Sequence, residues 1–202
     1  MKPKTPQLIL ASGSSQRSRL LKMCRIPHRV MVSHIKETPV SKEDPAGLVV
    51  RNAYNKANAV ASRLKTGLVI GADSVAYAGN HIIGKLGSRA KLTKTLKLMG
   101  GRVSFAYTGL ALIDIKNRVC VMSYARTTLK FKKPSGPELA RWTKIIGFRP
   151  ECAGGFSVDG PGAMLMPHIE GCYFNILGMP LSKMAELFDG LGYNILDFVR
   201  QR

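Results

Sequence analysis

Two short apolar segments in the sequence lack the alternation of polar residues that marks a half-exposed strand. Residues 8–11 are LILA and residues 68–72 are LVIGA, and each runs directly into polar residues. Strands of this kind are usually buried on both faces, as in an α/β sheet that is covered by helices. The sequence therefore predicts an α/β fold with flanking helices.

The rest of the pattern alternates helices with strands and contains one long antiparallel pair. Helices are expected over 44–64, 88–99, 136–146 and 181–188. Strands are expected over 28–33, 102–115, 118–132 and 163–171, with a hairpin turn at Gly79-Asn80. We therefore expect a mixed, partly long-stranded sheet with two lobes around a cleft. No linker divides the chain, so we expect one domain over residues 1–202.

Length and composition are those of a globular protein. A chain of 202 residues buries a full core without disulfide or metal support. No apolar stretch reaches the roughly 18 residues that cross a membrane, and the first strand begins at Leu8, which leaves no room for a signal peptide. The four cysteines are far apart, and we expect reduced thiols that fill core space. These features predict a soluble cytoplasmic protein without membrane association.

Positive charge is concentrated in the first three quarters of the chain. The formal net charge is +19, and residues 1–150 carry 28 Lys and Arg against 6 Asp and Glu, whereas residues 151–202 carry 3 against 6. This excess of positive charge attracts anions, either a nucleotide polyphosphate or a nucleic acid. The run KFKK at 130–133 would add to a basic surface for non-specific nucleic acid, although the sequence has no RNA-binding or helix-turn-helix motif.

The segment SGSSQR at 12–17 follows the first apolar strand and begins a helix. Backbone N–H groups at a helix N-terminus bind anions, and the side chains of Ser12, Ser14 and Arg17 would add donors to a phosphate. The same residues also fit an ordinary helix start, with a serine as N-cap and a solvated arginine. This segment alone leaves both interpretations open.

Four further charged residues stand in loops, on helices or at the predicted ends of strands: Glu37, Lys56, Asp73 and Lys85. In open α/β sheets, ligands bind near the carboxyl ends of strands, where Asp73 and the serine loop are both expected. Hydrolysis of a phosphoanhydride needs cations that neutralise phosphates, a divalent metal ion, and a carboxylate that binds the metal or activates water. These residues and Arg17 supply the protein groups for that chemistry.

The order of short motifs along the chain resembles the Maf family of nucleoside triphosphate pyrophosphatases. The motifs are LASGSxxR, ETP, NKA, GAD, GK, TGLAL, CAGGF with DG, IEG and GMPL, and the resemblance covers about Leu8 to Phe188. The resemblance implies a mixed α/β fold of the Maf and ITPase type and a homodimer. It also implies metal-dependent hydrolysis of a nucleoside triphosphate between its α and β phosphates, which yields the monophosphate and pyrophosphate.

The resemblance also implies roles for individual residues. Asp73, the aspartate of GAD, is the expected proton acceptor, with Lys56 and Lys85 as the other catalytic residues. The expected metal ligands for Mg²⁺ or Mn²⁺ are Glu37 and Asp73. The expected substrate-binding residues are Ser12, Ser14, Gln16, Arg17, Ser74 and Asp159.

The resemblance also implies that three of these positions distinguish family members by the nucleobase of their substrate. In this chain they are Gln16, Ser74 and Asp159. They match neither the Arg, Thr and Gln of dTTP/UTP enzymes nor the Trp, Gln and Glu of 7-methyl-GTP enzymes. The segment CAGGFSVDG is closer to the 7-methyl-GTP set, and the resemblance leaves the base open.

The sequence also departs from the usual pattern at two acids, with Lys36 before ETP and Asn55 before Lys56. Their loss leaves open a nucleotide-binding protein without turnover on the same scaffold. A second alternative, a nucleic-acid-binding protein on this scaffold, rests instead on the positive charge of residues 1–150 and on KFKK.

Overall fold

The computed structural model describes residues 5–37 and 44–201, and within them seven strands form one mixed sheet. The strands are β1 (Leu8–Leu10), β2 (Arg29–Val30), β3 (Leu68–Ala78), β4 (His81–Ile83), β5 (Val103–Asp114), β6 (Val119–Lys130) and β7 (His168–Glu170). Their order is β2-β1-β3-β5-β6-β7, with β4 paired to β3. β1 is parallel to β2 and β3, and the other pairs are antiparallel, which confirms the predicted mixed sheet.

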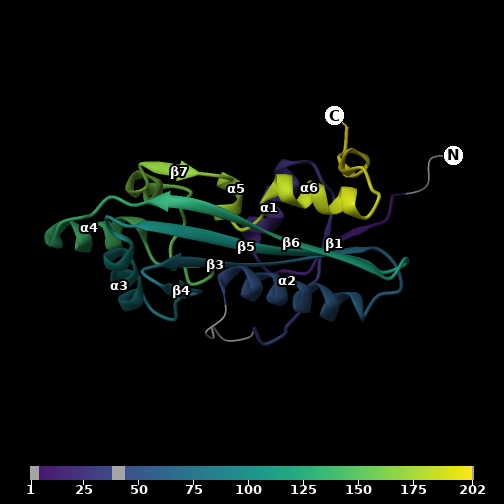
Figure 1. Ribbon diagram of the computed structural model, residues 1–202, viewed down its shortest axis with the longest axis horizontal. Helices are drawn as coiled ribbons and strands as arrows, with labels where there is room; N and C mark the ends of the chain where they lie inside the picture. Colours follow the sequence, from purple (N-terminus) through teal and green to yellow (C-terminus); the bar gives the residue numbers. More distant parts are fainter. Residues whose placement is uncertain (1–4, 38–43, 202) are drawn as a thin grey trace.

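Helices cover both faces of the sheet. They are α1 (Ser15–Met23), α2 (Pro45–Ala61), α3 (Arg89–Met99), α4 (Gly136–Ile146), α5 (Tyr173–Ile176) and α6 (Leu181–Gly190), with 3₁₀ turns at Pro161–Leu165 and Ile195–Phe198. α2 packs on one face, and α1 and α6 lie on the other (Figure 1). Because neighbouring residues of a strand face opposite ways, Val69 packs in the α2 core and Ile70 packs with Phe188 of α6.

A second hydrophobic core lies farther along the same strands. Ala76 of β3, Ala106 of β5 and Leu129 of β6 pack with Leu92 of α3 and with Phe156, which is far away in the sequence. The core around α2 and α6 and this second core share the strands β3, β5 and β6. They therefore form two lobes at the two ends of one long-stranded sheet. The predicted two-lobed α/β architecture is confirmed.

β3 is longer than predicted and does not end at Asp73. It continues to Ala78, and β5 pairs with it from Leu68 to Ala78. On the other edge of β3, the pairing with β1 stops at Ile70 and the pairing with β4 begins at Ala76. Residues 71–75 therefore have no strand neighbour on that edge among the described residues. We call this interruption the edge gap, and it lies between the two lobes.

Several local predictions are confirmed, and others need correction. Gly79 and Asn80 both have positive φ, as a two-residue hairpin turn requires, and Asp44 caps α2. β2 spans only two residues, because it is an exposed edge strand. The strand expected over 163–171 is a 3₁₀ turn followed by the three residues of β7, since Pro161 and Pro167 lack the N–H that a longer ladder needs.

Two further features bear on the predicted class of protein. No helix in the described ranges is both long enough and apolar enough to cross a bilayer. The four cysteines are free thiols, as expected, but all are partly exposed, and Cys24 packs against a hydrophobic core without being buried in it.

Candidate active site

Two lysines and two carboxylates gather at the edge gap, on the α2 side of the sheet. The Nζ atom of Lys56 lies 2.6 Å from Oδ1 of Asp73 and 2.9 Å from Oε1 of Glu37. Lys85 Nζ lies 3.1 Å from the same Oε1 of Glu37. Lys56 and Asp73 are buried, whereas the side chains of Glu37 and Lys85 are 41% and 55% exposed. The structure thus brings the four predicted catalytic and metal-binding residues into one cluster that opens to solvent.

The cluster depends on a close approach of α2 to the sheet. A Cβ atom at Gly71 would lie 2.1 Å from the carbonyl oxygen of Ala53, and one at Gly109 would lie 2.3 Å from the carbonyl group of Val49. Gly109 is the cross-strand partner of Asp73. The two glycines therefore allow the helix to lie directly over β3 and β5, at the point where Asp73 points toward it.

Asn52 is a member of the cluster that was not predicted from the sequence. Its Nδ2 donates to Oδ2 of Asp73 at 3.0 Å, while Lys56 donates to Oδ1. Asn52 and Lys56 are four residues apart and so share one face of α2. That spacing was visible in the sequence, but which face of the helix meets Asp73 was not.

The local charges keep Glu37 ionised over a wide range of pH. Burial alone would raise the pKa of Glu37, but hydrogen bonds and charges from Lys56 and Lys85 outweigh it and lower the pKa to about 2. Burial lowers the pKa of the Arg17 guanidinium, although the charges of Asp73 and Glu37 act in the opposite direction. Arg17 therefore adds a buried cation behind the cluster.

Arg17 of α1 is hydrogen-bonded on all sides by groups of the protein. Its Nη1 donates to Ser12 Oγ at 3.0 Å and to the carbonyl of Ala72 at 2.8 Å, and its Nη2 donates to Ser74 Oγ at 3.0 Å. Its Nε donates to the carbonyl of Gly178 at 2.8 Å. The arginine thus joins the loop after β1, the gap in β3 and the loop before α6, instead of pointing freely toward solvent.

Ser14 is the N-cap of α1. Its Oγ accepts from the backbone N–H of Arg17 at 3.4 Å, and Ser12 Oγ accepts from the N–H of Ser14 at 3.2 Å. The serine N-cap is therefore confirmed, but the solvated arginine of the same interpretation is wrong, because Arg17 is buried. Its binding of a phosphate stays a prediction.

A cavity of about 310 Å³ lies on the other side of the edge gap and is lined by residues of both lobes. Gln16, Ser74 and Asp159, the three predicted base-sorting residues, all line it. Asp159 reaches Gln16, whose Nε2 lies 3.5 Å from Oδ2, and it also forms an ion pair with Arg19. The glycine-rich segment CAGGFSVDG at 152–160, which contains Asp159, is thereby attached to α1 across the opening of the cavity. A volume of this size is at the lower end of the range for small-molecule pockets.

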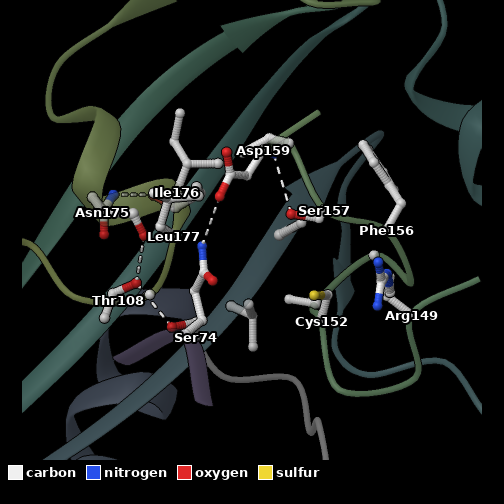
Figure 2. Close-up of a pocket in the computed structure, with 18 of the residues that line it drawn as sticks. Ser74, Thr108, Arg149, Cys152, Phe156, Ser157, Asp159, Asn175, Ile176 and Leu177 are labelled. Atoms are coloured by element: carbon white, nitrogen blue, oxygen red, sulfur yellow. Dashed lines mark hydrogen bonds between the residues drawn. The ribbon is translucent and has the colours of Figure 1, made fainter. Parts of the chain in front are cut away.

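The cavity also contains residues that were not predicted. Ser74 Oγ lies 2.9 Å from Oγ1 of Thr108, which donates to the carbonyl of Asn175 at 3.0 Å. Figure 2 shows these polar groups on one side of the cavity and Arg149, Cys152 and Phe156 on the opposite side. Thr108 lies opposite Ser74 in the β3–β5 register, which no short motif reveals.

The cavity and the charged cluster are joined through two consecutive residues of β3. Asp73 contacts Lys56 of α2, and Ser74 contacts Arg17 of α1, because adjacent side chains of a strand point to opposite faces. A ligand that crosses the edge gap can therefore contact both. The cavity wall combines apolar side chains, such as Leu129 and Phe156, with about as much polar surface, a mixture that suits a flat heterocycle with polar edges, and the lysines suit its phosphates.

The chain is similar in sequence to known proteins over nearly its full length. The family model described as Maf-like protein matches residues 7–191. The chain is 39% identical to a nucleoside triphosphate pyrophosphatase of Synechococcus sp. (strain JA-3-3Ab), over 95% of this chain and 98% of the relative. It is 34% identical to a dTTP/UTP pyrophosphatase of Pelotomaculum thermopropionicum, over 94% of this chain and 99% of the relative. It is also 34% identical to a 7-methyl-GTP pyrophosphatase of Nitrosococcus oceani, over 96% of this chain and 98% of the relative.

The family model covers most of the chain, and these relatives align with it over nearly their full length. The motifs at the edge gap, from LASGS to GAD, lie inside the matched range. The chain therefore belongs to the Maf family.

Proposed function

We propose that this protein hydrolyses a nucleoside triphosphate to the nucleoside monophosphate and pyrophosphate. The observation that carries the proposal is the cluster of Glu37, Lys56, Asp73 and Lys85 beside a cavity that suits a nucleobase. The names of the aligned relatives support the same reaction.

In this proposal the base occupies the cavity and the triphosphate crosses the edge gap. Lys56 and Lys85 neutralise phosphate charge on the α2 side of the sheet. Arg17 contributes to substrate binding mainly by fixing the segments around the edge gap, because it donates hydrogen bonds to Ala72, Gly178 and two serines. The loop that carries Ser12 and Ser14 lies next to the phosphates.

Asp73 accepts the proton of the attacking water. Lys56 and Asn52 hold its two oxygens in place, and each carboxylate oxygen retains a second lone pair for a water molecule. The water oxygen forms a bond to the α-phosphorus, the bond from that phosphorus to the bridging oxygen breaks, and pyrophosphate leaves with its electron pair. A positioned general base of this kind contributes about 10²- to 10⁴-fold to the rate.

The donor set at the gap fits a divalent cation. Glu37 Oε1 and Asp73 Oδ1 already converge on one cation, the ammonium of Lys56, and carboxylate oxygens are the ligands that Mg²⁺ prefers. The part of the chain that the structure describes has no group of three His, Cys, Asp or Glu that could hold a metal by itself. Glu37 and Asp73 would therefore hold Mg²⁺ or Mn²⁺ together with the substrate phosphates. The ion would supply Lewis-acid neutralisation of phosphate charge.

The test is pyrophosphate release from a panel of canonical and methylated nucleoside triphosphates, with Mg²⁺ or Mn²⁺. The Asp73→Asn variant is the control, because it keeps the shape of the side chain and loses the proton acceptor. We expect pyrophosphate and the monophosphate as products, and neither in the control. Release of orthophosphate and a diphosphate, or equal release from the control, would contradict the proposal.

The same panel of nucleoside triphosphates identifies the preferred nucleobase. Asp159 in the cavity can accept hydrogen bonds but is shared by Gln16 and Arg19, so the base competes with these two donors for it. Binding of nucleotides without product release would instead support the alternative of a nucleotide-binding protein.

A further inference from the structure

The face of the sheet that carries Asp73 continues beyond α2 as a row of aromatic rings. We call these rings the aromatic row, and they belong to Tyr77 of β3, Phe105 and Tyr107 of β5, and Tyr124 of β6. Their side chains share one face, because Tyr77 pairs with Phe105 and the other two lie at even spacing in the same register. Successive ring centroids are 6.3, 6.4 and 6.3 Å apart. Tyr124 is 46% exposed and the other three rings are partly exposed, so part of the row is open to solvent, although Tyr107 also packs against α2 and lines the cavity.

Cations accompany the aromatic row. The guanidinium of Arg126 lies over the ring of Phe105, 5.4 Å from its centroid, and Arg126 is exposed. Lys130 is on the same face, opposite Val103, and is also exposed. Neither forms a salt bridge with any carboxylate in residues 5–37 or 44–201, although Glu170 of β7 lies on this face beside Thr128. The two positive charges are therefore available to an anionic partner.

The combination of rings and cations favours one kind of partner. Successive bases of a single-stranded nucleic acid stack on exposed aromatic side chains while nearby cations bind the phosphates. A duplex keeps its bases stacked inside and does not offer them to such a row. A second copy of this chain would bring another net charge of +19 against the same face, which opposes self-association through it.

We propose that the aromatic row binds a single-stranded polynucleotide, with bases on the rings and phosphates beside Arg126 and Lys130. This binding is a further activity beyond nucleotide hydrolysis. Tyr124 and Arg126 do not line the cavity, so their substitution leaves hydrolysis of the nucleotide unchanged. The excess of Lys and Arg over Asp and Glu in residues 1–150 supplies a long-range attraction for the polynucleotide phosphates.

The experiment measures fluorescence anisotropy of labelled dT₁₅, U₁₅ and a 15-base-pair duplex with the full-length protein, at salt concentrations between about 50 and 200 mM. The test variants are Tyr124→Ala and Arg126→Gln. Arg118→Gln, in the exposed turn between β5 and β6, removes the same charge away from the aromatic row, and Tyr173→Ala removes a 39% exposed tyrosine from α5. Pyrophosphate release from the same preparations confirms that each variant is folded.

We expect Tyr124→Ala to weaken single-strand binding about fivefold or more. Arg126→Gln should lower the slope of log affinity against log salt by roughly 0.7, while the two controls stay within about twofold of the unsubstituted protein. Weaker binding of either single strand by the two test variants supports the proposal, and the difference between dT₁₅ and U₁₅ shows whether the DNA or the RNA oligomer binds more tightly.

Three results would overturn the proposal. The first is no single-strand binding at the lowest salt, or binding of the duplex that is equally tight. The second is an effect of the two test variants no larger than that of their controls. The third is a dimer in sedimentation that Tyr124→Ala dissociates, because a second copy would then cover the aromatic row.

Discussion

Substitution of Gly71 by alanine tests whether the close packing of α2 builds the catalytic cluster. The added Cβ would meet the carbonyl oxygen of Ala53 at 2.1 Å and the backbone nitrogen of Ala57 at 2.8 Å. Both are backbone atoms of the helix, so no side chain can rotate away. Ordinary van der Waals contact begins at 3.4 Å, and α2 must therefore move about 1.3 Å away from β3.

This displacement acts on stability and on activity. Forcing an extra methyl group into a packed core costs about 1–3 kcal/mol of unfolding free energy. Asn52 and Lys56 move with the helix, and their contacts of 3.0 and 2.6 Å with Asp73 lengthen or bend. Because a misplacement of about 1 Å costs about 100-fold in rate, we expect kcat/KM to fall about 100-fold in protein that is still folded.

The assay combines urea unfolding with pyrophosphate release at a temperature at which the variant is folded by circular dichroism. Gly136→Ala is the matched control, because a Cβ at the start of α4 would have no atom within 4 Å. Gly109→Ala is a second test, since its Cβ would lie 2.3 Å from the carbonyl group of Val49. If Gly71→Ala keeps the kcat/KM and the urea midpoint of Gly136→Ala, the position of α2 does not depend on the absence of a side chain at residue 71.

Three further predictions concern other parts of the molecule. Asp73→Asn should abolish pyrophosphate release without a change in the circular dichroism spectrum, and residual turnover above about 1% would argue against Asp73 as the base. Charges around Glu37 lower its pKa from 4.5 to about 2, so its stabilising effect is complete above about pH 4.5 and is lost as the pH falls toward 2. The unfolding free energies of the unsubstituted protein and of Glu37→Gln should therefore converge between pH 4.5 and 2; a constant difference would contradict this. The hydroxyl of Tyr193 donates to Oδ2 of buried Asp114 at 2.7 Å, which raises the pKa of Tyr193 to about 12. Tyr193→Phe should cost about 1–3 kcal/mol in urea unfolding, and a loss no larger than that of Tyr173→Phe would show that this bond contributes nothing.

The elements of the fold were predictable where local chemistry decides them. The cap of α2 at Asp44, the turn at Gly79 and Asn80, and the long β5–β6 pair all follow from short-range preferences of the residues. The end of β3 was not predictable in the same way. A carboxylate usually ends an apolar strand, but Asp73 stays inside one because Lys56 and Asn52 compensate its buried charge.

The cluster at the edge gap was only partly predictable. The sequence pointed to Glu37, Lys56, Asp73 and Lys85 through their residue types and their motifs. It did not reveal Asn52 or Thr108, because their roles depend on the face that α2 presents and on the register between β3 and β5. The sequence left Arg17 open between a phosphate-binding residue and a solvated cation, and only the folded chain shows it buried among carbonyl groups.

The sequence by itself determined the α/β class, the mixed sheet and the family of this protein, because these follow from local patterns and from the order of motifs along the chain. Only the tertiary structure decided where β1 and β4 leave the edge of β3 open, and thus where the two lobes and the charged cluster meet. It also decided that the aromatic row forms and is partly open to solvent, because Tyr77, Phe105, Tyr107 and Tyr124 share a face only in this strand register. Pairing register and helix contact are long-range properties, and no short stretch of sequence specifies them.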